Sequence, residues 1–128
     1  MKEHQTMQKQ LSDAELEIMK VIWNAKTPLL FAEITKALAE HGRDWQKNTL
    51  ITLLSRLIQK GFLSTDKHGR KNIYTPCITE HDFQTVQTKH FVDRVFQGKV
   101  SGLVTQLVRS DSLTEDEYEQ LKKILEEK

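Results

Sequence analysis

Leucines at helical spacing mark the stretch from 44 to 63. At about 100° per residue, four of them share one face of a helix: Leu50, Leu53, Leu54 and Leu57. The opposite face carries hydroxyl and amide side chains with one arginine: Asn48, Thr49, Thr52, Ser55, Arg56 and Gln59. Such groups read base edges and phosphates, whereas a Glu/Lys mixture would only solvate a helix. The alternative is a core helix with a neutral, wet outer face.

Two further helices are predicted before this one. Ser12 with Glu15 forms a capping box, which opens a helix that ends near Ala25 and is mostly buried. A second helix spans 31–40 and lacks a side-chain cap at its start. The helix with the leucine face then runs from Gln46 to Lys60, and Gly61 ends it.

A short β-hairpin is predicted next. Residues 62–66 and 71–75 contain β-branched and aromatic side chains, with a turn at Gly69 and Pro76 ending the pairing. Three helices and a basic hairpin form a winged helix-turn-helix, whose third helix enters the major groove. Lys67, Arg70 and Lys71 at the hairpin tip would then reach phosphates. A simply solvated hairpin loop is the alternative for the tip.

The last 51 residues are predicted to be helical throughout, with helices opening at Thr79, after Gly98 and at Thr114. Three short helices cannot close a core alone, so this segment is expected to form a homodimer. The residues expected at its interface are Phe83, Phe91, Val95, Leu103, Leu107 and Leu121.

The predicted fold class is therefore mainly α. A polar tail (1–10) precedes a winged helix-turn-helix (11–77) of three helices and a two-stranded β wing, and an all-helical dimerisation domain (78–128) follows.

The charge is divided unevenly between these parts. Residues 1–77 contain 12 Lys and Arg against 8 Asp and Glu, a net +4, while residues 78–128 contain 7 against 10, a net −3. The basic residues of the first part gather in 43–71. A local basic patch is typical of a nucleic-acid surface, although ordinary solvation also tolerates it.

Several other classes of protein find little support. No apolar run is long enough to span a membrane, and the polar first ten residues contain no signal peptide, so a cytoplasmic protein is expected. Catalytic motifs and cofactor fingerprints are absent, which indicates a binding protein without a cofactor. The single cysteine, Cys77, could begin a metal site with His81 and His90, but a packed small side chain is the more usual role.

One apolar residue is unusual for its position. Ile51 lies about 100° from the leucine face of its helix, beside Asn48 and Ser55. A buried role is geometrically awkward there, and a thymine methyl group is the natural partner for such a side chain in the major groove.

The sequence resembles a known family along most of its length. The spacing Trp-x-x-x-Thr-x-x-Thr-x-x-x-Arg-Leu in 45–57, followed by Lys60-Gly61-Phe62, is similar to the recognition helix of the bacterial penicillinase repressors (BlaI/MecI type), to which copper-responsive CopY repressors are related. Residues 11–15 leading to Trp23 and the pair Leu103-Val104 also resemble this family. The resemblance implies a homodimeric repressor that binds a double-stranded operator dyad.

The resemblance also implies a switch. A membrane-bound metalloprotease-type sensor would trigger cleavage of the repressor, and the similar positions place the cleaved bond at Gln106-Leu107. By position, Thr49 and Thr52 would lie at base edges, with Asn48, Ser55, Arg56 and the preceding Lys47 nearby or on phosphates.

This sequence departs from the family at Gln46, Asn48, Ile51 and Gly98-Lys99, so its operator and the linker near residue 98 can differ. A metal-responsive repressor of the same family and a winged helix that binds protein remain as alternatives. The cysteine-rich tail of the copper repressors is missing.

Overall fold

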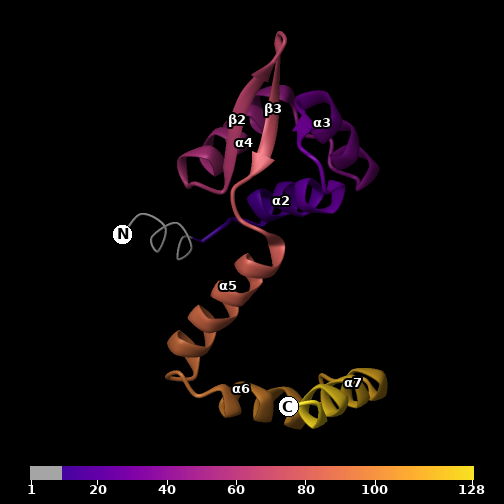
Figure 1. The fold of residues 1–128 in the computed structure, drawn as a ribbon, viewed down its shortest axis with the longest axis vertical. Helices are drawn as coiled ribbons and strands as arrows, with labels where there is room; N and C mark the ends of the chain where they lie inside the picture. The colour runs from indigo at the N-terminus through magenta and orange to yellow at the C-terminus, as the bar shows by residue number, and fades with distance from the viewer. Residues whose placement is uncertain (1–9) are drawn as a thin grey trace. The chain divides into compact units, whose positions relative to one another are not determined.

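The structure, a computed structural model, describes residues 10–128 and contains two compact units (Figure 1). The first unit ends at Gln87, and the second covers Thr88–Lys128. Most of the expected polar tail therefore lies outside the described residues. Among the helices of residues 10–128, none combines the length and the apolar character that a membrane crossing requires.

The three helices of the first unit follow the predicted ranges. They are α2 (Asp13–Ala25), α3 (Phe31–Glu40) and α4 (Lys47–Gln59). The capping box of α2 is confirmed, because the Glu15 N–H donates to Ser12 Oγ over 3.1 Å and the Ser12 N–H donates to Glu15 Oε1 over 2.8 Å. At α3 no side chain caps the first turn, and instead the Leu30 N–H donates to Glu33 Oε1 over 2.8 Å.

The predicted stop after α4 is also confirmed. Gly61 has a φ of +86°, a conformation that costs a residue with a side chain more than it costs glycine. The Gly61 N–H donates to Ile58 O over 3.0 Å, and the Phe62 N–H donates to Leu57 O over 2.9 Å. These two bonds form a Schellman motif, which satisfies the last carbonyl groups of α4 and turns the chain into the sheet.

The sheet has one strand more than the sequence predicts. Strands β2 (Leu63–His68) and β3 (Lys71–Pro76) form the expected antiparallel hairpin around a two-residue turn, and Pro76 is the last residue of β3. In addition, β1 (Leu29–Leu30) pairs with β3, so the strand order is β1-β3-β2. The predicted two-stranded wing is confirmed, but sequence reasoning missed β1, because a strand of two residues is too short to show alternation.

The core of the first unit lies between its three helices and the sheet. The largest apolar side chains that are almost fully buried come from α2, α3, α4 and the residue after Gly61: Ile18, Met19, Ile22, Ile34, Leu54, Leu57 and Phe62. All four leucines predicted for the inner face of α4 are buried. The predicted fold class, mainly α with a winged helix-turn-helix followed by helices, is confirmed.

Helix α5 (Glu80–Val95) begins inside the first unit. Phe83 is only 8% exposed, and its ring centroid lies 5.4 Å from that of Trp23 and 5.8 Å from that of Phe62. The Trp23 Nε1–H also donates to the carbonyl of Ile78 over 2.9 Å. Phe83 was expected at a dimer interface, but it completes the core of the winged helix, which extends that unit ten residues past 77.

The second unit contains the end of α5, then α6 (Val100–Arg109) and α7 (Glu115–Glu126). The predicted capping box of α7 is confirmed, since the Glu117 N–H donates to Thr114 Oγ1 over 3.1 Å and the Thr114 N–H donates to Glu117 Oε1 over 3.0 Å. Gly102 lets the chain approach Phe96 closely, because a Cβ at this position would lie 2.9 Å from the Phe96 ring. That ring meets the Phe91 ring edge to face, with centroids 5.9 Å apart.

Candidate nucleic-acid interface

The outer face of α4 carries seven of the residues that the sequence places at DNA. All seven side chains are exposed in the structure: Lys47, Asn48, Thr49, Ile51, Thr52, Ser55 and Arg56. The leucines on the inner face hold the helix against the core. Packing therefore fixes the rotation of α4 about its axis, and this polar strip stays outside.

One hydroxyl on this strip is already engaged. Thr52 Oγ1 donates its proton to the carbonyl of Asn48, one turn earlier, over 3.0 Å. The hydroxyl can still accept hydrogen bonds through its lone pairs, and the γ-methyl group keeps its apolar surface. In this rotamer Thr52 offers DNA an acceptor and a methyl group.

Two basic residues of the predicted patch form ion pairs within the fold. Arg43 Nε and Nη2 each lie 2.6 Å from a carboxylate oxygen of Glu17, and the guanidinium stacks 5.4 Å above the ring of Trp45. The hydrogen bond from Arg43 holds the pKa of the Glu17 carboxyl below its ordinary value. The charge of Arg43 is thus largely balanced by Glu17 of α2.

The second ion pair joins the N-terminal end of α2 to the C-terminal end of α4. Lys60 Nζ donates to Glu15 Oε1 over 2.7 Å and to the Gln10 carbonyl over 3.0 Å. Glu15 is only 1% exposed, so burial raises the pKa of its carboxyl, but hydrogen bonds from Lys60 and Ser12 outweigh this and hold the pKa below its ordinary value. This pair fixes the C-terminal end of α4 against α2.

Sequence reasoning missed both ion pairs as positioning elements. Glu15 was recognised only as a helix cap, although the same carboxylate oxygen also holds Lys60, 45 residues later. Arg43 and Glu17 are 26 residues apart. No local signal in a single sequence could have found these partners.

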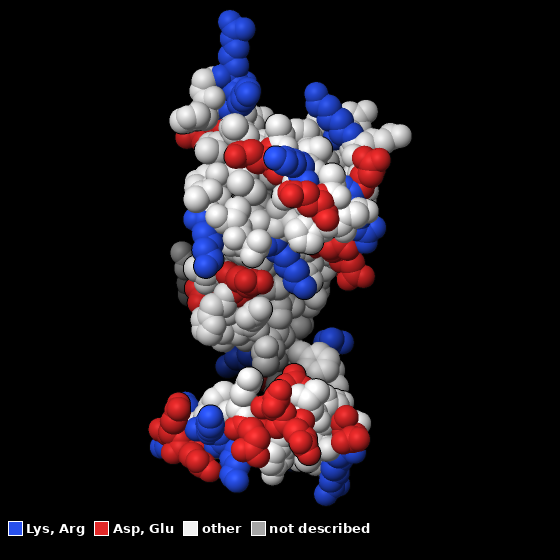
Figure 2. Space-filling view, turned by 90° about the vertical axis from the view of Figure 1, so that its right-hand side faces the viewer, with Lys and Arg blue, Asp and Glu red and all other residues white. Residues whose placement is uncertain are grey.

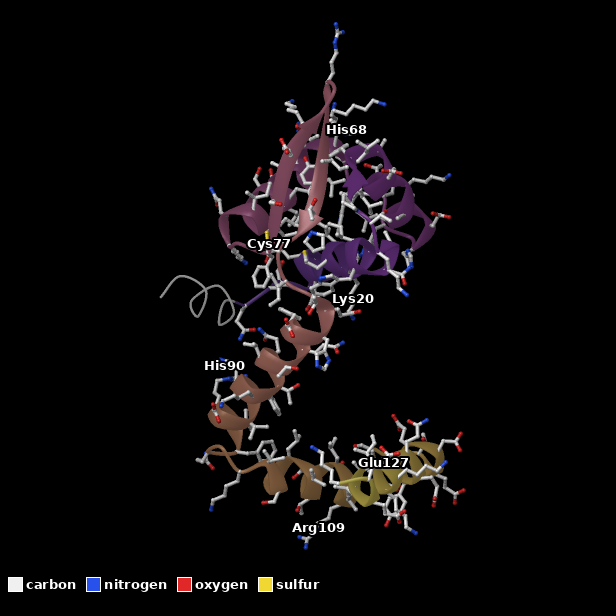
Figure 3. All side chains as sticks on the ribbon, in the orientation of Figure 1. Lys20, His68, Cys77, His90, Arg109 and Glu127 are labelled. Atoms are coloured by element: carbon white, nitrogen blue, oxygen red, sulfur yellow. The ribbon has the colours of Figure 1, made fainter. Side chains whose placement is uncertain are left out.

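The basic residues of the hairpin lie around its tip. Lys67, Arg70 and Lys71 are exposed, and His68, which is labelled near the tip in Figure 3, pairs with Lys71 across the turn. Gly69, with a φ of +69°, makes this two-residue turn possible. Figure 2 shows blue side chains projecting at the end of the winged helix where Figure 1 draws the hairpin tip.

The first unit thus presents two basic elements, the outer strip of α4 and the tip of the β2–β3 hairpin. Lys47, Arg56, Lys67, Arg70 and Lys71 form no ion pair in the part of the chain that the structure describes. Their charges are consequently available to a polyanion.

The second unit leaves many apolar side chains in solvent. Of the residues expected at a dimer interface, Phe91, Val95 and Leu107 are 41%, 42% and 38% exposed, while Leu103 and Leu121 are half-buried. Further exposed apolar residues belong to the same unit: Val100, Val104, Val108, Tyr118, Ile124 and Leu125. Within a single chain, Val104, Leu107 and Val108 of α6 are therefore uncovered.

The residues of the expected cleavage site lie in α6, where Gln106 and Leu107 are both exposed. The candidate metal ligands Cys77 and His81 are exposed, and His90 is half-buried. Over residues 10–128 no three His, Cys, Asp or Glu side chains gather in a way that could hold a metal ion.

The fold, the outer strip of α4 and the basic hairpin tip together define a winged-helix protein with a candidate DNA surface. Residues 11–127 match the family model described as "Penicillinase repressor", and the chain belongs to this family. The resemblance seen in the sequence is thereby confirmed.

Similar proteins support this assignment over most of the chain. The penicillinase repressor of Bacillus licheniformis is 40% identical over 118 residues, which cover 92% of this chain and 91% of that protein. The methicillin resistance regulatory protein MecI of Mammaliicoccus sciuri is 33% identical over 121 residues, which cover 93% and 95%. A solved DNA-binding domain of the repressor BlaI is 46% identical, with a TM-score of 0.51 over 57% of this chain and 87% of that domain.

Proposed function

We propose that this protein is a homodimeric transcriptional repressor, which binds a pseudo-palindromic operator with α4 in the major groove and the hairpin tip on phosphates. It acts in the cytoplasm by binding rather than by catalysis. The observation that carries the proposal is the outer strip of α4, where seven side chains of the types that contact bases and phosphates are exposed together above a buried leucine face.

Two findings support this proposal. The BlaI domain of similar fold and 46% identity is described as DNA-binding. The relatives are named as repressors or regulators of penicillinase and of methicillin resistance, which favours a role in the control of antibiotic resistance. A two-fold dimer would place two α4 helices on one side of the duplex, with half-sites separated by about 10 bp or a multiple.

Binding measured across a salt series tests this function. For full-length protein, affinity for its operator should fall steeply with salt, because Lys and Arg release counterions from phosphates. Arg56→Ala should weaken binding and lower the slope of log K against log [salt] by about 1, with little change in sequence preference.

Lys20→Ala is the matched control, since it removes one exposed positive charge from α2 and should leave the slope unchanged (Figure 3). An affinity that hardly varies with salt would contradict DNA binding and favour the other candidate, a winged helix that binds protein through an apolar surface.

Dimerisation through the second unit should appear in thermal unfolding. Phe91, Val95 and Leu107 add to an exposed apolar surface of a kind that is rare on soluble monomers. The melting temperature of full-length protein should therefore rise with its concentration. A fragment 1–87, which lacks the second unit, should melt at the same temperature at all concentrations.

Relief of repression is proposed to occur by cleavage at Gln106-Leu107 after a signal from a membrane-bound metalloprotease-type sensor. The exposure of both residues in α6 supports this site, because a protease must first reach the bond. The bond is nonetheless helical, so α6 must open locally before it can be cut.

A further inference from the structure

The composition of the α4 strip points to the base chemistry that it selects. Ile51 and Thr52 both lie three or four residues from Asn48 and from Ser55, so each of them is a neighbour of those two side chains on the helix surface. Ile51 is 43% exposed although it lies in a helix whose other apolar side chains are largely buried. Among the residues that the structure describes, this part of its surface is left uncovered.

The hydroxyl proton of Thr52, the next residue, is not available to DNA. This proton is directed to the Asn48 carbonyl, 3.0 Å away, so Ile51 and Thr52 together present methyl groups and one acceptor. Guanine offers only acceptors in the major groove, N7 and O6, and therefore finds no partner on this pair of residues. Thymine offers a C5-methyl group, and adenine and cytosine offer an amino donor.

We propose that Ile51 selects a thymine through its C5-methyl group, and that Thr52 accepts from a neighbouring major-groove amino group. The operator is thereby read in part by a methyl group and not by hydrogen bonds alone. This inference rests on the proposed function, and it assigns Ile51 as a determinant of specificity.

The test uses full-length protein and the duplex that it selects with highest affinity from a random library. Each thymine of the half-site is replaced in turn by deoxyuridine, which removes the C5-methyl group and changes no hydrogen-bonding group. Burying one methyl group contributes about 0.8 kcal/mol, so one replacement should weaken binding about fourfold. In the Ile51→Ala variant, the same deoxyuridine replacement should cause no further loss of affinity. In Ile51→Val it should still cause part of the loss seen with the native protein.

A second probe adds the methyl group instead of removing it. Replacing the same T·A pair by C·G should weaken binding. Replacing the cytosine of that pair by 5-methylcytosine should then raise the affinity of the native protein about fourfold, but not that of Ile51→Ala. Thr52→Val, which keeps the shape but removes the acceptor, should relax discrimination at the neighbouring amino group, and Thr52→Ser should preserve it.

The outcomes separate this inference from the function on which it rests. If a specific duplex is selected but no deoxyuridine replacement weakens binding, the assignment of Ile51 is wrong while the repressor function stands. If Ile51→Ala lowers the melting temperature and leaves the deoxyuridine effect intact, Ile51 is a structural residue and the inference is likewise overturned. Failure to select any duplex would overturn both.

Discussion

A chain that ends at Gln106 is expected to bind the operator at least about a hundredfold more weakly than the full-length protein, approaching non-specific affinity. The truncation splits α6 and removes α7, and with them much of the exposed apolar surface assigned to the dimer. The winged helix should stay folded, because its core lies within the first unit. Each half-site would then be bound by one winged helix alone. Fluorescence anisotropy on one labelled operator at fixed salt measures the difference.

A chain ending at Ser112 is the matched control, since it keeps α6 whole and loses only α7. Its affinity tells whether the intact α6 is sufficient for pairing. Equal affinity of the 1–106 chain and the full-length protein would remove cleavage at Gln106-Leu107 as a means of releasing DNA.

Phe83→Ala, made in the fragment 1–87, should lower the free energy of unfolding by about 3 kcal/mol. The ring is buried between Trp23 and Phe62, so its removal leaves a cavity in the core of the winged helix. Urea unfolding of the fragment measures this loss without interference from dimerisation. For the same reason, a fragment ending at Cys77 should be markedly less stable than one ending at Gln87.

Gln84→Ala is the control for this experiment, because it alters the next residue of α5, which is exposed. Its effect should stay within about 0.5 kcal/mol. A similar small effect of Phe83→Ala would show that the first unit does not need α5 and that its boundary lies nearer to Cys77.

The features that sequence reasoning predicted well are those with local causes. The helix starts at Ser12 and Thr114 depend on a carboxylate three residues later, and the end of α4 depends on a glycine that adopts a positive φ. The leucine face of α4 follows from helical periodicity alone. These signals sufficed to predict a winged helix and the strip that it exposes.

The missed features depend on contacts between distant residues. Phe83 lies on a helix whose pattern fits an intermolecular interface as well as a core, and only the tertiary position of Trp23 distinguishes the two. The face of α6 shows the reverse case, since its apolar spacing predicts burial, whereas Val104, Leu107 and Val108 are exposed in the single chain. Periodicity indicates that a face is to be covered, but it does not identify what covers it.

The strand order also bears on how copies of this protein can associate. Strand β2 is the outer strand of the sheet, and from Ser64 to His68 its residues are all exposed. Asp66 and Lys67 place opposite charges along this edge, and charged side chains there hinder the addition of a further strand. At the other edge lies β1, which pairs only with Ile73 and Tyr74 of β3, and an edge strand this short offers few backbone groups to a further strand. Growth of the sheet from one molecule to the next, the usual route to insoluble fibres, is thereby disfavoured.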